Sequence, residues 1–336
     1  MRSLDHPPSD LAARIVLLLG APRSGTTWLG KIFDSHPDVL YRHEPDTLDR
    51  GGELPKMVPA AEIPVWSAEA RAYLLRLAAQ SRLKSGGKLP LFRKSYRSPA
   101  AHRLHVAQVA LLRLLTAVPG LAAPAAFMPL PDLARRPPAR VVIKSVSGCG
   151  CAGLFATALP EARIVFVVRP PFGQVASMLE GVRRGLLDAH EAIYGLDTWP
   201  DASRYGLSEA ILARLPLVEQ LAWHWVLLNQ KALAELASRP GVRVVPYPAL
   251  CRDPQREARA LFDFAGLDWP EASASFVASS TSFTGRAGYF DVRRNLAQAQ
   301  SRWQAVLSAE DCARITVIVR QSSLADWLDA PREAAP

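Results

Sequence analysis

The sequence predicts an α/β fold in which helices cover both faces of a central parallel sheet. Four short apolar runs have the composition of strands buried on both faces, and they lie at residues 14–19, 140–144, 163–168 and 242–245. Each run is preceded or followed by a segment with the apolar spacing of a helix. Strands that alternate with helices in this way are typical of a three-layer sandwich around a parallel sheet.

Length and composition agree with one folded domain over residues 1–336. Apolar residues make up 49% of the chain and charged residues 21%, which excludes disordered, collagen-like and coiled-coil classes. The 40 Lys and Arg against 31 Asp and Glu give a net charge of +9, which favours anionic ligands. Only seven of the 40 basic residues are lysine, so the alternative explanation is a GC-rich genome, which encodes arginine freely.

The first predicted unit is a strand, a glycine loop and a helix. The strand at residues 14–19 ends at Gly20, and the loop runs to Gly25. Residues 26–35 then place apolar side chains at helical spacing and stop before Pro37.

Between residues 50 and 138 the pattern weakens, and we interpret this stretch as an insertion or cap. Helices are expected at 67–83 and 102–118. Residues 84–97 hold five basic residues and no acidic one, and the favoured interpretation is a mobile, solvated loop. The alternative is a surface that binds an anionic substrate, and a nucleic acid is disfavoured because no known binding module accompanies the segment.

The later helices have clearer signals. A helix is expected over 218–238. Asp253 is an expected N-cap with Pro254 at the first helical position, and Ser308 with Asp311 forms an expected capping box.

Cysteine usage and hydropathy indicate a reducing compartment and no membrane span. The four cysteines form neither a disulfide framework nor a C-x-x-C pair, so no metal site is assigned. The longest apolar stretch, 109–130, is interrupted by Arg, Gly and Pro, and no signal peptide is evident. We therefore expect a cytoplasmic protein.

The loop from Gly20 to Thr27 has the properties of an anion cradle. It lies between a predicted strand and a predicted helix, so its N–H groups converge on the positive end of the helix dipole. The spacing G-x-x-x-x-G matches the phosphate-binding loop of nucleoside triphosphatases, but Thr26 stands where that motif requires lysine. The neighbouring strands end in Lys144 and Arg169 and not in a magnesium-binding acid. A triphosphate with Mg²⁺ is therefore disfavoured, and an anion neutralised by side chains is favoured.

These residues resemble those of sulfotransferases that use 3′-phosphoadenosine 5′-phosphosulfate (PAPS). Residues 22–28 look like the 5′-phosphosulfate loop of that family, and Arg169 with Ser177 looks like its 3′-phosphate pair. Residues 247–254 are similar to a stretch common in bacterial members, and residues 289–303 resemble the late segment that closes over the 3′-phosphate end of the cofactor. The resemblance covers most of the chain outside 50–138 and implies a P-loop nucleoside-triphosphatase-like sulfotransferase fold. In such a protein the insertion at about 50–138 would contribute to the acceptor site.

The resemblance also implies roles for individual residues, with PAPS as co-substrate and no metal. Arg23 would neutralise charge on the bridging oxygen of the 5′-phosphosulfate, and the other loop residues would hold that group; they are Ser24, Gly25, Thr26, Thr27 and Trp28. The 3′-phosphate end would be bound by Arg169, Ser177, Arg293 and Arg294.

Glu44 is the candidate general base. The stretch Tyr41-Arg-His-Glu-Pro45 resembles the Y-x-x-E-P stretch of carbohydrate 6-O-sulfotransferases, and His43 is the alternative base. Sulfotransferases of small phenols and steroids use a histidine shortly after the lysine that Lys144 matches, and no histidine follows here. Lys144 is expected either to stabilise the sulfuryl oxygens or to form a structural ion pair.

The sequence thus favours a PAPS-dependent sulfotransferase acting on a hydroxyl of a glycan or another small molecule. A P-loop kinase would need a lysine at position 26. A non-catalytic anion-binding protein of the same fold stays open.

Overall fold

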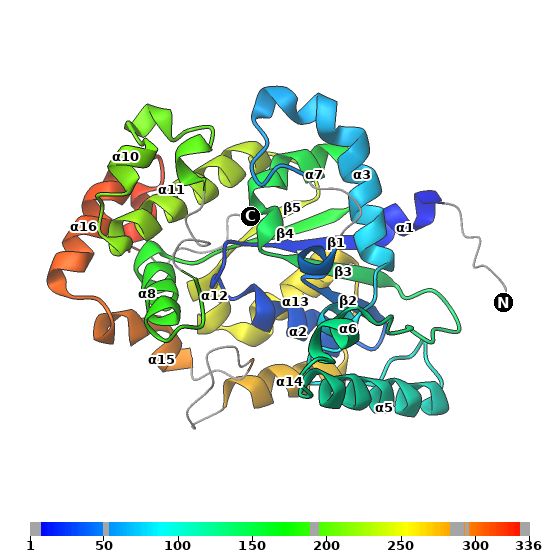
Figure 1. Ribbon diagram of the computed structural model, residues 1–336. Coiled ribbons are helices and arrows are strands. Elements are labelled where there is room, and N and C mark those ends of the chain that lie inside the picture. Colours follow the sequence, from blue (N-terminus) through cyan, green and yellow to red (C-terminus); the bar gives the residue numbers. More distant parts are fainter. Residues whose placement is uncertain (1–7, 50–53, 189–194, 283–291, 293–295, 330–336) are drawn as a thin grey trace.

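The computed structural model describes residues 8–49, 54–188, 195–282, 292 and 296–329 (Figure 1). Its centre is a five-stranded sheet of order β2-β3-β1-β4-β5, in which every neighbouring pair is parallel. The strands are β1 (Ile15–Leu19), β2 (Val39–His43), β3 (Arg140–Ser145), β4 (Arg163–Val168) and β5 (Val242–Pro246). All carboxyl ends therefore lie at one edge of the sheet, where Lys144 of β3 is in register with both Leu18 and His43.

Helices cover both faces of this sheet, which confirms the predicted three-layer sandwich (Figure 1). One face packs against α2 (Thr26–Ser35), α13 (Pro254–Ala265) and α14 (Glu271–Thr281). The other face packs against α3 (Ile63–Ala79), α7 (Ala152–Ala158), α8 (Pro171–Arg183), α11 (Leu217–Leu236) and α16 (Ala309–Arg320). The shorter helices are α1 (Pro8–Arg14), α4 (Leu83–Gly86), α6 (Ala122–Phe127), α10 (Glu209–Leu212), α12 (Tyr247–Arg252) and α15 (Leu296–Ser301).

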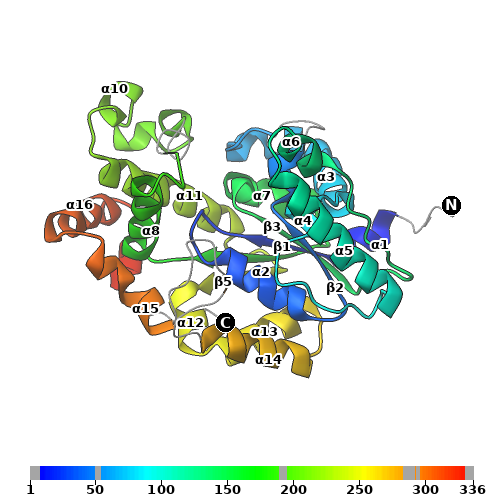
Figure 2. The same cartoon turned by 60° about the horizontal axis from the view of Figure 1, so that its bottom comes forward.

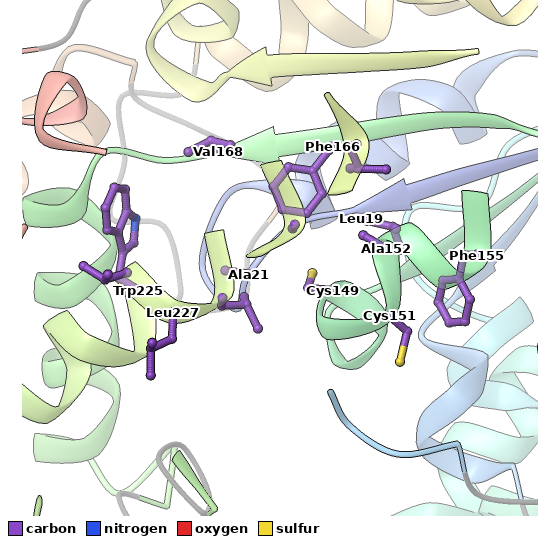
Figure 3. Close-up of a cluster of buried hydrophobic side chains, with 14 of the residues drawn as sticks. Leu19, Ala21, Cys149, Cys151, Ala152, Phe155, Phe166, Val168, Trp225 and Leu227 are labelled. Atoms are coloured by element: carbon purple, nitrogen blue, oxygen red, sulfur yellow. The ribbon is translucent and has the colours of Figure 1, made fainter. Parts of the chain in front are cut away.

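The larger core cluster explains why the strands read as unbroken apolar runs. Side chains from β1 and β4 meet those of α7 and α11 in this cluster (Figure 3). Residues buried there include Leu19, Phe155, Phe166, Val168 and Trp225. A strand that is covered on both faces has apolar residues at successive positions, and its sequence does not alternate between apolar and polar residues.

The predicted helix caps are confirmed. The Asp253 side chain accepts a hydrogen bond from the Arg256 N–H at the start of α13. Ser308 and Asp311 form the expected reciprocal capping box at the start of α16. Both satisfy N–H groups that have no partner inside the helix.

The insertion follows β2 and contains α3, α4, α5 (Pro99–Thr116) and α6, which gather on one side of the molecule (Figure 2). The helices expected at 67–83 and 102–118 are present with boundaries at 63–79 and 99–116. Its body is attached to the sheet by Arg42 of β2, whose guanidinium donates to both carboxylate oxygens of Asp132, at 2.8 and 2.5 Å. Because Arg42 is fully buried, this bidentate pair is a strong link between β2 and the end of the insertion.

The interpretation of residues 84–97 as a mobile, solvated loop is wrong. Lys94 is 8% exposed and Tyr96 is 1% exposed. The Lys94 ammonium donates to the backbone carbonyl of Asp34 in α2 and lies 2.8 Å from the Oδ1 of the same residue. The acidic partner belongs to a helix 60 residues earlier, so the basic composition of the segment alone could not reveal it.

None of the helices in the described part of the chain is both long enough and apolar enough to cross a membrane.

Candidate functional site

The loop between β1 and α2 has a backbone shape that only particular residues allow. Arg23 has a φ of 71° and Gly25 a φ of 100°, so both lie in the left-handed region. The Ser24 N–H donates to the Ala21 carbonyl at 3.0 Å, which closes the turn. A Cβ at position 25 would lie 2.4 Å from the ring of Tyr247 in α12. The glycine is therefore required both by its φ and by the close approach of this ring.

The floor of the loop contains a cysteine thiol and a hydroxyl without a partner. The Gly20 N–H donates to Cys149 Sγ at 3.1 Å, and Cys149 belongs to the core cluster of Figure 3 together with Ala21. Ser24 is fully buried, and its Oγ makes no hydrogen bond to any described residue. A buried hydroxyl without a partner costs free energy, and an anion held by this loop would supply an acceptor for its proton.

Three candidate residues from distant parts of the chain meet beside the loop. The Arg23 Nε donates to the Ser177 Oγ of α8 at 3.1 Å. Arg169, which follows β4, donates through Nη1 to the Arg23 carbonyl at 3.1 Å and through Nη2 to the Ala299 carbonyl at 3.2 Å. The Arg169 guanidinium also lies 5.1 Å from the centre of the Tyr247 ring. Two guanidinium groups and a hydroxyl therefore converge at the carboxyl edge of β1 and β4.

Glu44 and Lys144 form an ion pair at the ends of β2 and β3. The Lys144 ammonium donates to Glu44 Oε1, and the Glu44 N–H donates to the Lys144 carbonyl at 2.8 Å. Lys84 of α4 lies 3.4 Å from Glu44 Oε2. Burial raises the pKa of Glu44, but Lys144 and the other cations outweigh burial and lower it to about 2. The carboxylate is therefore ionised at neutral pH, while burial lowers the pKa of the Lys144 ammonium.

His43, the alternative base, lies immediately before Glu44 and is buried. Its Nδ1 is 3.0 Å from the Tyr41 hydroxyl. Burial, together with the charge of Lys144, lowers the pKa of His43 well below its ordinary value. The imidazole is therefore neutral at physiological pH, and burial also raises the pKa of Tyr41, so the phenol keeps its proton.

Asp46 is an acidic residue at this edge that was not among the predicted site residues. The Ser145 Oγ donates to Asp46 Oδ2 at 2.5 Å and accepts from the Gly148 N–H at 2.9 Å. Burial raises the pKa of Asp46. A serine directly after Lys144 and an acid two positions after Glu44 were the available signals, because polar residues at the ends of neighbouring strands meet.

The other predicted site residues lie in the first turn of α2 or outside the described residues. Thr26 is buried at the first turn of α2, and Thr27 is partly buried. The Trp28 indole is fully buried in the core and donates to the Ser280 Oγ at 3.1 Å. Arg293 and Arg294 lie outside the described residues. Within the described ranges, no group of three or more His, Cys, Asp or Glu side chains could hold a metal ion.

Comparison with known proteins gives one family and one curated relative. The sequence model of the sulfotransferase family matches residues 16–271. A segment of 56 residues is 41% identical to mouse carbohydrate sulfotransferase 5. That segment spans 15% of this chain and 14% of the mouse protein, so the likeness concerns a small part of both.

Several solved structures are similar over most of their length, at low identity. The sulfotransferase domain of the Synechococcus PCC 7002 olefin synthase is 17% identical with a TM-score of 0.43, covering 94% of this chain and 95% of that one. A sulfotransferase from Alicyclobacillus acidocaldarius is 17% identical with a TM-score of 0.37, covering 93% and 97%. Mouse sulfotransferase SULT7A1, complexed with PAP, is 15% identical with a TM-score of 0.40, covering 95% and 90%.

Proposed function

Because the chain belongs to the sulfotransferase family, we propose that it transfers the sulfuryl group of PAPS to a hydroxyl of a carbohydrate or another small-molecule acceptor. 3′-phosphoadenosine 5′-phosphate (PAP) is the second product. The 56-residue match to a carbohydrate sulfotransferase supports a sugar hydroxyl as the acceptor.

The observation that carries this proposal is the charge at the carboxyl edge of the sheet. Lys144 lies one residue before the end of β3 and Arg169 directly follows β4, and these strands lie on either side of β1. Arg169 also contacts Arg23 of the loop. A P-loop kinase places a metal-binding acid at such a strand end, because Mg²⁺ must neutralise the triphosphate. Here cationic side chains take that position, which suits a phosphosulfate bound without a metal.

The described residues fit the donor at both of its anionic ends. The orphaned Ser24 hydroxyl, the loop N–H groups and the hydroxyls of Thr26 and Thr27 would bind the 5′-phosphosulfate. Arg169 and Ser177 would bind the 3′-phosphate end. Arg23, whose Nε donates to the Ser177 Oγ at 3.1 Å, would neutralise charge on the bridging oxygen of the 5′-phosphosulfate. When bound, PAPS would supply the sulfuryl group that the acceptor oxygen takes.

The acceptor proton would go to Glu44. This carboxylate is ionised at neutral pH, whereas His43 is neutral and hydrogen-bonded to Tyr41. A pKa of about 2 makes Glu44 a weak base as long as Lys144 holds it. An anionic group beside Lys144 would compete for that ammonium and raise the pKa of Glu44, so that the base would strengthen where the reaction takes place. Lys144 would then stabilise the negative charge on the sulfuryl oxygens.

Calorimetric titration with PAP, against ATP with Mg²⁺, tests the proposal. We expect PAP to bind at least about 10-fold more tightly than Mg-ATP, because a site built for a 3′-phosphate loses charged hydrogen bonds with ATP. Ser177→Ala should weaken PAP binding and leave the weak ATP binding unchanged. Preference for Mg-ATP would favour a kinase, and failure of both ligands to bind would favour a non-catalytic protein; either result would refute the proposal.

A further inference from the structure

Two cysteines in the turn after β3 contact different parts of the molecule. The turn, Ser147–Cys151, leads from β3 into α7, and both cysteines belong to the larger core cluster (Figure 3). Cys149 Sγ accepts a hydrogen bond at 3.1 Å from the Gly20 N–H, at the start of the loop between β1 and α2. Cys151 Sγ donates to the Pro55 carbonyl, also at 3.1 Å. The turn is therefore joined to the loop by one sulfur and to the insertion by the other.

The turn itself is held by a buried ion pair of α11. The Lys231 ammonium donates to Glu235 Oε1 at 2.6 Å and to the Gly150 carbonyl at 2.9 Å. The other carboxylate oxygen, Glu235 Oε2, accepts from the Gly153 N–H at 3.2 Å. One pair of charges thus binds the backbone at two points. Because Cys149 directly precedes Gly150, its sulfur has a fixed position relative to α11.

Gly20, which donates to this sulfur, is closely surrounded. A Cβ at Gly20 would lie 2.6 Å from Ser24 Oγ and 2.7 Å from the Val167 carbonyl oxygen of β4. Ser24 carries the buried hydroxyl that makes no hydrogen bond to any described residue. A shift of Gly20 would therefore displace the hydroxyl that is available to a bound anion.

The Cys149 thiol is suited to accept this hydrogen bond and unsuited to covalent chemistry. Cys149 is fully buried, and burial raises the pKa of its thiol to about 12. A thiol that keeps its proton is neither a nucleophile nor a metal ligand. Its sulfur is a weak hydrogen-bond acceptor, and without it the N–H of the buried Gly20 would lose its partner, which costs free energy.

On the basis of the proposed function, we infer that Cys149 is a positioning residue of the donor site: its sulfur fixes the first N–H of the loop, so that the loop is shaped for the 5′-phosphosulfate before the donor binds. Cys149 acts through Gly20 and Ser24 and does not itself contact the donor. A site that is arranged in advance loses less binding free energy to the ordering of its own groups.

Amide hydrogen exchange of the full-length protein without ligand tests the first step. Mass spectrometry follows exchange in peptides covering residues 15–28 in the wild type, Cys149→Ala, Cys149→Ser and Cys151→Ala. Cys151→Ala is the matched control, because it removes a buried thiol of the same turn whose hydrogen bond goes to the insertion. We expect exchange in this segment to be at least about 5-fold faster in Cys149→Ala than in Cys151→Ala. Cys149→Ser should exchange more slowly than Cys149→Ala, because its hydroxyl oxygen also accepts a hydrogen bond.

Calorimetric titration with PAP tests the second step. Cys149→Ala should bind PAP at least about 5-fold more weakly than the wild type, whereas Cys151→Ala should keep the wild-type Kd and Cys149→Ser should recover most of the affinity. Thermal midpoints show whether the variants fold. If Cys149→Ala does not fold, Cys149→Val takes its place, since valine fills the space of the thiol without providing an acceptor.

Equal exchange in Cys149→Ala and Cys151→Ala, or an equal Kd for PAP in these two variants, would overturn the inference. If the wild type itself failed to bind PAP, the proposed function would fall, and the exchange experiment would still decide whether Cys149 fixes the loop.

Discussion

Replacing Glu44 with glutamine removes the carboxylate partner of the buried Lys144 ammonium. The ion pair lowers the pKa of Glu44 from 4.5 to about 2. This lowering of about 2.5 pH units corresponds to about 3 kcal/mol of stability. Because the folded-state pKa is depressed, that stability is fully present above the unfolded-state pKa and is lost as the pH falls through the folded-state pKa. About 2 kcal/mol of it is lost between pH 7 and pH 3.

Urea unfolding followed by tryptophan fluorescence measures this effect. The free energy of unfolding is determined at pH 7, 4.5 and 3 for the wild type and for Glu44→Gln. At pH 7 the variant should be less stable by about 3 kcal/mol, since the Lys144 ammonium loses its partner. The difference between the two proteins should then shrink by about 2 kcal/mol at pH 3, and most of that change should occur below pH 4.5.

A surface pair provides the control. Glu161 pairs with Arg71 through two hydrogen bonds of 3.0 Å, and both side chains are more than one-third exposed. Glu161→Gln should change stability by less than about 1 kcal/mol at every pH. If the wild type and Glu44→Gln differed by the same amount at pH 7 and pH 3, the ion pair would not depress the pKa of Glu44, and our account of the base would be wrong.

Three further outcomes follow from the same geometry. Glu44→Gln should lower kcat by about 10²- to 10⁴-fold, because the acceptor proton loses its base, while calorimetry shows an unchanged Kd for PAP; wild-type turnover would remove Glu44 from the mechanism. Arg23→Ala and Ser177→Ala should each weaken PAP binding by about 10-fold or more, since each would remove a hydrogen bond to a phosphate of the cofactor; calorimetry that showed the wild-type Kd for both would contradict the assignment of the cofactor site. Gly25→Ala should abolish PAP binding and lower the thermal midpoint, because its Cβ meets a tyrosine ring at 2.4 Å, whereas Gly120→Ala, also at positive φ but in open space, should retain binding; equal behaviour of the two variants would show that the close contact is unimportant.

The sheet could be predicted from the sequence wherever a strand is buried on both faces. Four of the five strands were predicted within one residue at each end, because their apolar runs stop at glycine, proline or charged residues. No strand is predicted at Val39–His43, because Arg42 interrupts its apolar pattern. That arginine is buried through Asp132, a partner 90 residues later that no local pattern reveals.

Some contacts of the candidate site could likewise be predicted from the sequence, and others could not. The order of the strands brings Arg23, Arg169 and Ser177 together, and this could be expected because parallel strands end at one edge. The contact of Lys84 with Glu44 could not be predicted, because it depends on how the insertion folds back onto β2. The sequence shows that a charged side chain is present, whereas the tertiary structure determines which residue pairs with it.

The attachment of the insertion through buried charges bears on any attempt to exchange acceptor specificity between relatives. A chimera that received a foreign segment between β2 and β3 would keep Arg42 and Asp34 in the recipient but lose Asp132 and Lys94. Arg42 would then be buried without its carboxylate partner, and Asp34 would keep only Lys31 as a partner. Loss of one partner of a buried ion pair costs about 3–5 kcal/mol. A graft should therefore carry matching changes at positions 42, 34 and 31 of the recipient, so that every buried charge again faces an opposite one.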